Sequence, residues 1–181
     1  MYGMINNAIE TMVTEHYDVA TWERIKAHAA LDTEVYISNQ GYPDSDTYAL
    51  VTAASEVLQL PAEEILEAFG QHWVLRTATE QYGPLLDTAG NSIQEFLCNL
   101  PNFHAHVILT LPNLEPPEFR VAQVTDSSLE LHYRSHRPGL NAFVIGLLKG
   151  LGTRFDTPVD ATLQDTQSVN GSHESTFLVC W

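Results

Sequence analysis

The chain has 181 residues, the size of one ordinary domain, and its 44% hydrophobic and 17% charged residues are typical of a folded protein. Eight Lys and Arg against 23 Asp and Glu give a formal net charge of −15, which argues against binding to nucleic acid or to an anionic membrane surface. There is no apolar run of about 20 residues, no signal-peptide pattern and no disulfide framework, since only Cys98 and Cys180 are present, so we expect a single cytoplasmic domain.

Helical periodicity characterises the first 110 or so residues. Apolar side chains recur every three or four positions over 4–13 and predict a first helix, and Thr21 is placed to cap a second one. Residues 42–45 form a turn sequence before a third helical pattern, and Pro61 suits the first position of a fourth helix.

The same pattern continues with interruptions up to about residue 110. Gly and Pro at 83–84, and Gly and Asn at 90–91, punctuate the chain before Ser92, which is placed to cap a helix through Leu97. A last short helix is expected over about 100–109, ended by Pro112.

The pattern then changes to alternation. We expect an antiparallel hairpin, one long helix over 140–155 and two further strands joined by a turn at Asn170-Gly171. The fold class is therefore α+β, with a helical part (about 1–110) followed by a small antiparallel sheet with one long helix (about 111–181). The four strands are expected at 118–124, 128–135, 159–166 and 175–181.

Several common catalytic signals are missing from the sequence. It has no phosphate-binding loop, no dinucleotide fingerprint, no paired-cysteine or zinc-protease motif, and no local signature of a nucleophile beside a base. Gly146, Gly150 and Gly152 lie within the predicted long helix, where close backbone packing explains them better than a nucleotide site does.

The second predicted strand brings three hydrogen-bond donors to one face. Side chains two apart share a face, so Tyr133, Ser135 and Arg137 follow the apolar Leu129 and Leu131. Three donors aligned in this way suit an anion, and arginine has a planar fork that matches a carboxylate or a phosphate. On spacing alone, an Arg137 that has simply reached the exposed end of the strand is a slightly better interpretation.

Two histidines lie close together on the last predicted helix. His104 and His106 are two positions apart, so their side chains diverge by roughly 200° around a helix and are badly placed to chelate one metal ion. A single inward-facing histidine could be an axial ligand, although taken alone such a residue is more often structural.

Together these segments resemble the haem-nitric oxide/oxygen binding (H-NOX) family, which includes the haem domain of soluble guanylate cyclase and bacterial stand-alone gas sensors. The resemblance covers essentially the whole chain, and the upstream histidine makes it more specific than the Y-x-S-x-R motif alone. It is carried by Met1-x-Gly3, Ala68-Phe69-Gly70, His104, Pro117-x-Phe119, Tyr133-x-Ser135-x-Arg137, Gly139-Leu140 and Gly146-Leu147.

The resemblance implies that the chain binds haem b between its helical and sheet-containing parts. His104 would be the axial ligand of the iron, and Tyr133, Ser135 and Arg137 would donate to the two propionates. The ring also needs an apolar slot. The other residues expected at the site are Met1, Ile5, Phe69, Trp73, Leu97, Pro117, Phe143 and Leu147.

The implied function is a haem-based gas sensor, which is a binding module rather than an enzyme. Nitric oxide would weaken the iron–His104 bond, relax a ring that Pro117 and Ile5 hold distorted, and so rotate the N-terminal helices against the sheet part. The family suggests a histidine kinase or a cyclic-nucleotide signalling enzyme as a separate effector. Two other classes stay open, namely a haem- or metal-dependent peroxidase or oxygenase, and a metal-free domain whose Arg137 binds a carboxylate.

The choice of gas depends on donors near the iron. Oxygen-binding members of the family carry a tyrosine where this chain has Phe143, and some carry a supporting tryptophan where it has Ile9. Trp73 offers one donor, and Tyr82 cannot be placed from the sequence. We therefore predict binding of nitric oxide and carbon monoxide without a stable dioxygen complex.

Overall fold

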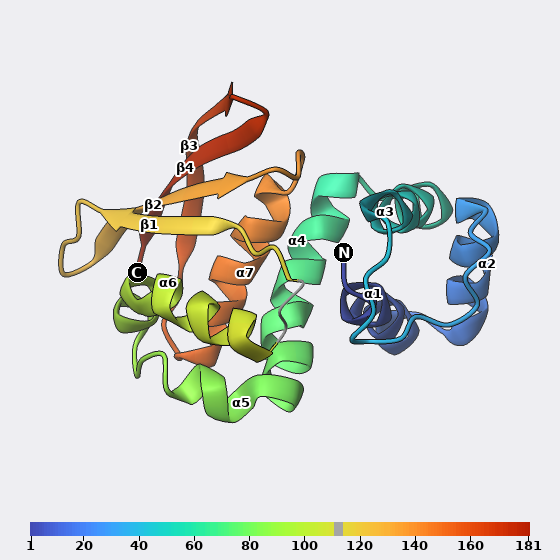
Figure 1. Cartoon of the computed structure of the whole chain (residues 1–181), viewed down its shortest axis with the longest axis horizontal. Coiled ribbons are helices and arrows are strands. Elements are labelled where there is room, and N and C mark those ends of the chain that lie inside the picture. The colour runs from blue at the N-terminus through green and yellow to red at the C-terminus, as the bar shows by residue number, and fades with distance from the viewer. Residues whose placement is uncertain (111–113) are drawn as a thin grey trace.

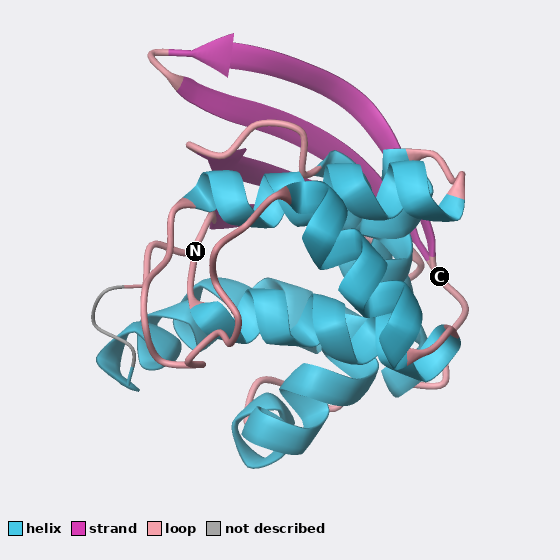
Figure 2. Ribbon diagram, turned by 90° about the vertical axis from the view of Figure 1, so that its right-hand side faces the viewer, coloured by secondary structure: helices cyan, strands magenta, loops and turns pink. Residues whose placement is uncertain are grey.

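The computed structural model describes residues 1–110 and 114–181 and confirms the α+β class. Figures 1 and 2 show the strands gathered in one layer over helices, with the first three helices together at the far end of the long axis. In chain order the elements are α1 (Gly3–His16), α2 (Val19–Ala29), α3 (Asp44–Leu58), α4 (Ala62–His72), the π-helical turn η1 (Trp73–Ala78), α5 (Thr79–Asp87), α6 (Ile93–Thr110), β1 (Glu118–Ala122), β2 (Ser128–Ser135), α7 (Asn141–Arg154), β3 (Asp160–Val169) and β4 (Ser172–Cys180).

The four strands form one antiparallel sheet in the order β1-β2-β4-β3. Alternation along β2 turns Leu129, Leu131 and Tyr133 inward, and all three side chains are buried. Tyr133 is paired with Phe119 on one side and with Ser175 on the other. The central position of β2 therefore holds the inward-facing Tyr133 and Ser135 in a fixed register.

The buried side chains form two clusters. The N-terminal core contains residues of α1 to α4, such as Ile9, Trp22 and Leu50, whereas the sheet-side core joins η1, α5, α6 and α7 to the sheet. Trp73 packs against both clusters. The core therefore divides near the end of α4, and not at the change of sequence pattern near residue 110.

Close packing of α4 against α7 explains the glycines of the long helix. A Cβ atom on Gly146 would overlap the carbonyl oxygen of Glu67, and one on Gly70 would overlap the carbonyl oxygen of Phe143. A Cβ atom on Gly150 would lie 3.0 Å from the Val74 side chain. The prediction that these glycines serve backbone packing is confirmed.

Two details of the predicted helices are wrong. The cap of α2 is Asp18, whose carboxylate accepts from the Thr21 amide at 2.6 Å, because the helix begins three residues earlier than expected. The two helices expected before residue 110 are one helix, α6, which continues through Pro101: Leu97 and Leu100 before it are buried, and Phe103 after it is partly buried against the same sheet-side core. Ser92 does cap α6, with its hydroxyl accepting from the Glu95 amide at 3.2 Å, whereas Pro112 lies outside the described residues.

The stretch between α4 and α6 was not predicted as regular structure. It forms the π-helical turn η1 followed by α5, which is bent at Tyr82, where the backbone leaves the helical region (φ −131°, ψ 18°). The neighbouring Pro84 lacks an amide hydrogen and so favours such a bend.

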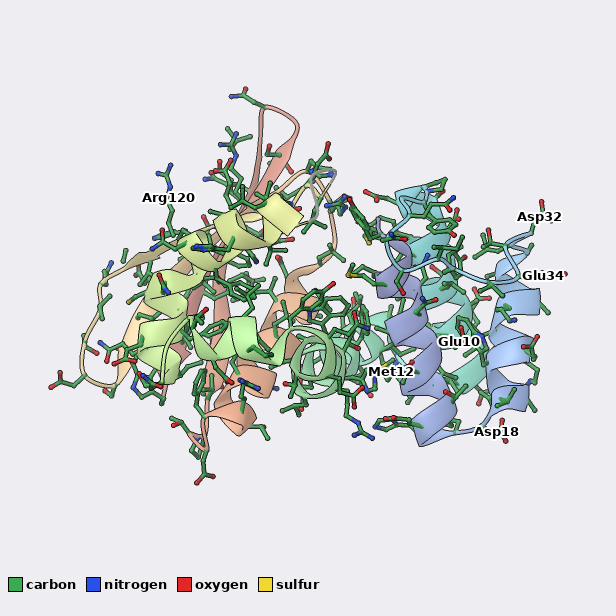
Figure 3. All side chains as sticks on the ribbon, turned by 60° about the horizontal axis from the view of Figure 1, so that its bottom comes forward. Glu10, Met12, Asp18, Asp32, Glu34 and Arg120 are labelled. Carbon is green, nitrogen blue, oxygen red and sulfur yellow. The ribbon has the colours of Figure 1, made fainter. Side chains whose placement is uncertain are left out.

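Charge is unevenly distributed over the molecule. Residues 1–72 hold 12 of the 23 acidic residues but only two of the eight Lys and Arg. Figure 3 shows Asp18, Asp32 and Glu34 at the outer edge of the molecule around α2, and Glu10 on α1. Within the described ranges, no helix has the length and apolar character that crossing a bilayer requires.

Candidate functional site

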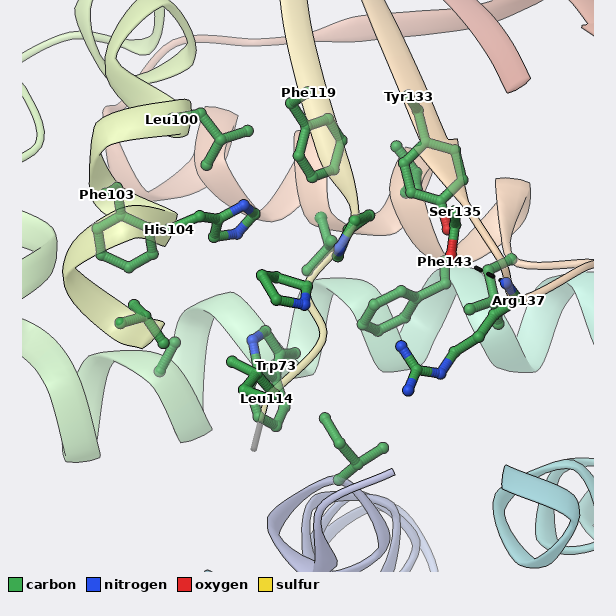
Figure 4. Close-up of a pocket in the computed structure, with 18 of the residues that line it drawn as sticks. Trp73, Leu100, Phe103, His104, Leu114, Phe119, Tyr133, Ser135, Arg137 and Phe143 are labelled. Carbon is green, nitrogen blue, oxygen red and sulfur yellow. Dashed lines mark hydrogen bonds between the residues drawn. The ribbon is translucent and has the colours of Figure 1, made fainter. Parts of the chain in front are cut away.

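A cavity of about 550 Å³ lies where the two cores meet. Its walls come from the start of α1, η1, α5, α6, the strands β1 and β2, and α7, and most of the lining side chains are apolar. This volume falls within the range of roughly 300–1,000 Å³ that is usual for small-molecule and cofactor sites. The cavity is therefore large enough for a cofactor, and Figure 4 shows its labelled side chains.

His104 extends from α6 into this cavity (Figure 4). Its ring lies among aromatic neighbours, with centroids 5.8 Å from Phe103 and 5.6 Å from Phe119. Burial lowers the pKa of His104 to about 4, against an opposing effect of the Pro117 backbone carbonyl. The imidazole is therefore neutral near pH 7 and keeps a lone pair that can bind a metal.

His106 has a different environment from His104. It is exposed, and its Nδ1 atom lies 2.8 Å from the backbone carbonyl oxygen of Asn102. His106 does not line the cavity. The helical geometry thus separates the two histidines as expected, with one in the cavity and one at the surface.

Tyr133, Ser135 and Arg137 reach the same cavity from β2 and the residues after it (Figure 4). Tyr133 and Ser135 are buried, and the Ser135 hydroxyl accepts from the Arg137 amide at 3.1 Å. Burial raises the pKa of the Tyr133 hydroxyl, although Ser135 and Arg137 oppose this. These groups therefore supply neutral and cationic donors on one wall.

The Arg137 side chain, which is 17% exposed, is bonded to two acceptors. Its Nε donates to Asp44 Oδ2 at 2.7 Å, and its Nη1 donates to the Glu115 carbonyl oxygen at 2.9 Å. The Asp44 carboxylate also accepts from the Met1 amino group at 2.5 Å. Burial, which would raise the pKa of Asp44, is outweighed by these two cationic donors, which hold that pKa below its usual value.

Most of the other expected site residues line the cavity. Phe69 does not, and the expectation that it would is wrong. Its ring lies 5.0 Å from that of Phe143 and 6.4 Å from that of Trp73, because its position on α4 turns it into the N-terminal core. The expected residues that do line the cavity, besides those already described, are Met1, Ile5, Trp73, Leu97, Pro117, Phe143 and Leu147.

Tyr82 and Asp44 are among the lining residues that were missed or left unplaced from the sequence alone. Tyr82 lines the cavity, and its hydroxyl donates to the thioether sulfur of Met4 at 3.6 Å. Asp44 also lines it, from the first turn of α3. The bend at Tyr82 and the pairing of Asp44 with a residue 93 positions away are tertiary features, so no local pattern indicated either one.

The chemistry of the lining fits haem. The apolar walls suit the faces of a porphyrin, the neutral His104 suits its iron, and the donors of Tyr133, Ser135 and Arg137 suit its carboxylates. In the described part of the chain, no group of three or more His, Cys, Asp and Glu could hold a bare metal ion.

Comparison with known proteins gives a family and a set of relatives. The family model described as Haem-NO-binding matches residues 2–163. Soluble guanylate cyclases gcy-35 and gcy-32 of Caenorhabditis elegans are 31% and 29% identical over 170 and 168 residues, which is 91% of this chain in both cases. The chain spans about a quarter of the length of these relatives (25% of each).

Solved structures share the fold over almost the whole chain. A mutant H-NOX protein from K. algicida, described as Fe(II) and unliganded, has a TM-score of 0.86 at 24% identity and covers 99% of this chain and 96% of its own. An H-NOX protein from S. oneidensis, described in the Fe(II)NO ligation state, has a TM-score of 0.87 at 20% identity, with coverage of 100% and 99%. At these identities the likeness shows the fold.

Proposed function

The chain belongs to the haem-NO-binding (H-NOX) family, and on that premise we propose that it is a haem-based gas sensor that binds nitric oxide and carbon monoxide. The observation that carries this proposal is the neutral His104 inside an apolar cavity that also holds the Tyr133, Ser135 and Arg137 donors. A bound haem b would supply an iron with one coordination position open to a diatomic gas.

The residues of this chain divide the work of holding the cofactor. With haem bound, His104 would offer its imidazole lone pair to the iron, the Tyr133 and Ser135 hydroxyls would donate to the carboxylates, and Arg137 would add a balancing positive charge. Ile5 comes from α1, and Pro117 comes from the segment before β1. Because these two residues belong to different parts of the fold, a planar group between them would link its own shape to the position of α1.

The lining of the cavity favours nitric oxide and carbon monoxide over dioxygen. Phe143 has no hydroxyl, and Ile9 is buried in the N-terminal core and does not line the cavity. Besides the donors assigned to the carboxylates, the cavity lining includes the Trp73 indole and the Tyr82 hydroxyl, and the latter is already bonded to Met4. A bound dioxygen needs a strong donor, whereas nitric oxide does not.

The proposal includes a separate effector protein that receives the signal from this chain. We propose a histidine kinase or a cyclic-nucleotide signalling enzyme, in line with the guanylate cyclase relatives, and no catalytic role for this chain itself. The acidic charge disfavours nucleic acid and anionic membranes as partners, and a cytoplasmic location stays a prediction.

Replacement of each of the two histidines in turn tests the assignment of His104 as the iron ligand. His104→Gly should lose haem after reconstitution and recover it when imidazole is added, because the vacancy then accepts a free ligand. His106→Ala should keep the wild-type Soret band, since its ring lies at the surface. The measurement is absorption during a haem titration, and loss of haem in His106→Ala but not in His104→Gly would refute the assignment.

A further inference from the structure

A junction between the N-terminal core and the sheet runs along the edge of the cavity. It contains the Asp44–Arg137 ion pair and a hydrogen bond from the Tyr48 hydroxyl of α3 to the Pro138 carbonyl at 2.8 Å. Asp44 and Arg137 line the cavity, whereas Tyr48 and Pro138 do not. The ion pair is therefore the part of the junction that a molecule in the cavity can reach.

The guanidinium of Arg137 has no complete edge available for a second carboxylate. An arginine presents two bidentate edges, formed by Nε with Nη2 and by Nη1 with Nη2. Nε is bonded to Asp44 and Nη1 to the Glu115 carbonyl, so each edge is half occupied. The Asp44 carboxylate holds the place that a ligand carboxylate would need for two parallel bonds.

Replacing the Asp44 carboxylate by a ligand carboxylate at the Arg137 guanidinium conserves charge and hydrogen bonds. The incoming group brings the same charge and the same acceptor atoms, so Arg137 does not lose its partner. Asp44 keeps the Met1 amino group at 2.5 Å and has His136 Nε2 at 4.0 Å, so its charge is not left alone after release. The two side chains of the pair are 17% and 32% exposed, which leaves the pair open enough to exchange.

We propose that Asp44 is a latch on the cofactor site, displaced from Arg137 when a haem propionate takes the Nε–Nη2 edge. Because Asp44 begins α3 and Arg137 follows β2, this exchange removes the ion pair between α3 and the sheet and leaves the Tyr48–Pro138 bond. Cofactor loading then sets how firmly the N-terminal core is held to the sheet. The inference rests on the proposed haem function, since it requires a ligand that carries carboxylates.

The rate of haem uptake by the haem-free full-length chain tests the latch. Asp44→Asn removes the competing charge, so uptake followed by the Soret band in a stopped-flow mixer should be about threefold to tenfold faster. Asp46→Asn is the matched control, because it removes the same charge from the same turn of α3 at a residue that does not line the cavity. It should leave the rate unchanged.

A double-mutant cycle separates competition for Arg137 from a general effect of charge. In an Arg137→Ala background, Asp44→Asn should give no further acceleration, because there is no guanidinium to compete for. In the haem-free protein, Asp44→Asn should also speed amide hydrogen exchange at the start of α3. Circular dichroism checks folding, and Asp44→Ser replaces Asp44→Asn if the latter is unfolded.

Three results would overturn the latch. They are an unchanged or slower rate in Asp44→Asn, an equal acceleration in Asp46→Asn, and an equal acceleration without Arg137. A wild-type chain that takes up no haem at all would instead refute the proposed function, so the two failures can be told apart.

Discussion

Arg137 divides its guanidinium between the Asp44 carboxylate and the Glu115 carbonyl, and it is the one cation among the cavity donors that we assign to the cofactor. Tyr133 and Ser135 add hydroxyls on the same wall, and both are buried. A charged donor that is partly shielded from water contributes more to holding a carboxylate than a neutral hydroxyl does.

Replacement of Arg137 is therefore expected to affect the cofactor more than replacement of Tyr133. Arg137→Ala should weaken haem binding by on the order of 2–5 kcal/mol, because a carboxylate in the cavity loses its charged partner. Tyr133→Phe should have a milder effect. Transfer of haem to an apoprotein competitor measures both, and unchanged retention in Arg137→Ala would show that this residue does not face the cofactor.

His72, which does not line the cavity, should make the free energy of unfolding depend on pH. Its side chain is buried between α1 and α4, its Nε2 has no partner, and its Nδ1 lies 4.0 Å from the Glu15 carboxylate. Burial lowers the pKa of His72, although Glu15 opposes this while His16 and Arg76 add to it. The folded protein therefore holds this side chain neutral at a pH where the unfolded chain is protonated.

The free energy of unfolding should fall as the pH falls below about 6.5, since the unfolded state then binds more protons than the folded state. His72→Gln should make this dependence shallower, and the part that remains should include His104, whose pKa is lowered to about 4. Urea unfolding of the haem-free protein at pH 7.5 and pH 5 measures it. An equally steep dependence in His72→Gln would assign the effect to other groups.

At the scale of elements, the contact between α4 and α7 positions the part of the cavity wall that contains Trp73 and Phe143. Gly70 and Gly146 allow the two backbones to approach, and the cavity is lined by Trp73, which directly follows α4, and by Phe143 of α7. The distance between the helices therefore sets the positions of both side chains.

Adding a methyl group at the contact between α4 and α7 should lower the stability of the protein. Gly146→Ala should destabilise the protein by about 1–3 kcal/mol, because the new Cβ meets the Glu67 backbone rather than a flexible side chain. Gly83→Ala is the control, since an added Cβ there has no atom within 4 Å. Chemical denaturation measures the difference, and equal stabilities of the two variants would contradict the close-packing interpretation.

The elements also show what local patterns can predict. Period-two alternation located β1 and β2, because the inward face of β2 is buried and register is strongly specified there. The strands β3 and β4 were located around the turn at Asn170-Gly171, and β3 is exposed along most of its length. The bend at Tyr82 and the continuity of α6 through Pro101 depend on tertiary packing, so spacing rules did not predict them. At the site, the motif residues lie in the cavity as expected, but Asp44 enters it only because α3 meets the end of β2.

At the scale of the whole molecule, the cavity lies where the N-terminal core meets the sheet-side core. Its walls take residues from both, such as Ile5, which packs against the N-terminal core, and Leu148 of the sheet-side core. A cofactor whose shape or position depends on a bound gas would thus act on both cores at once. This is the physical basis for proposing that gas binding changes the position of the N-terminal helices, which an effector protein could detect.

The most direct test is the absorption spectrum of the reduced, haem-reconstituted protein before and after exposure to nitric oxide, carbon monoxide and air. We predict an intense Soret band that shifts with nitric oxide and with carbon monoxide, and no lasting dioxygen complex in air. A dioxygen complex that persists would overturn the ligand assignment, and its loss in Trp73→Phe or Tyr82→Phe would identify the donor. A protein that stays colourless with haem supplied would contradict the sensor function itself.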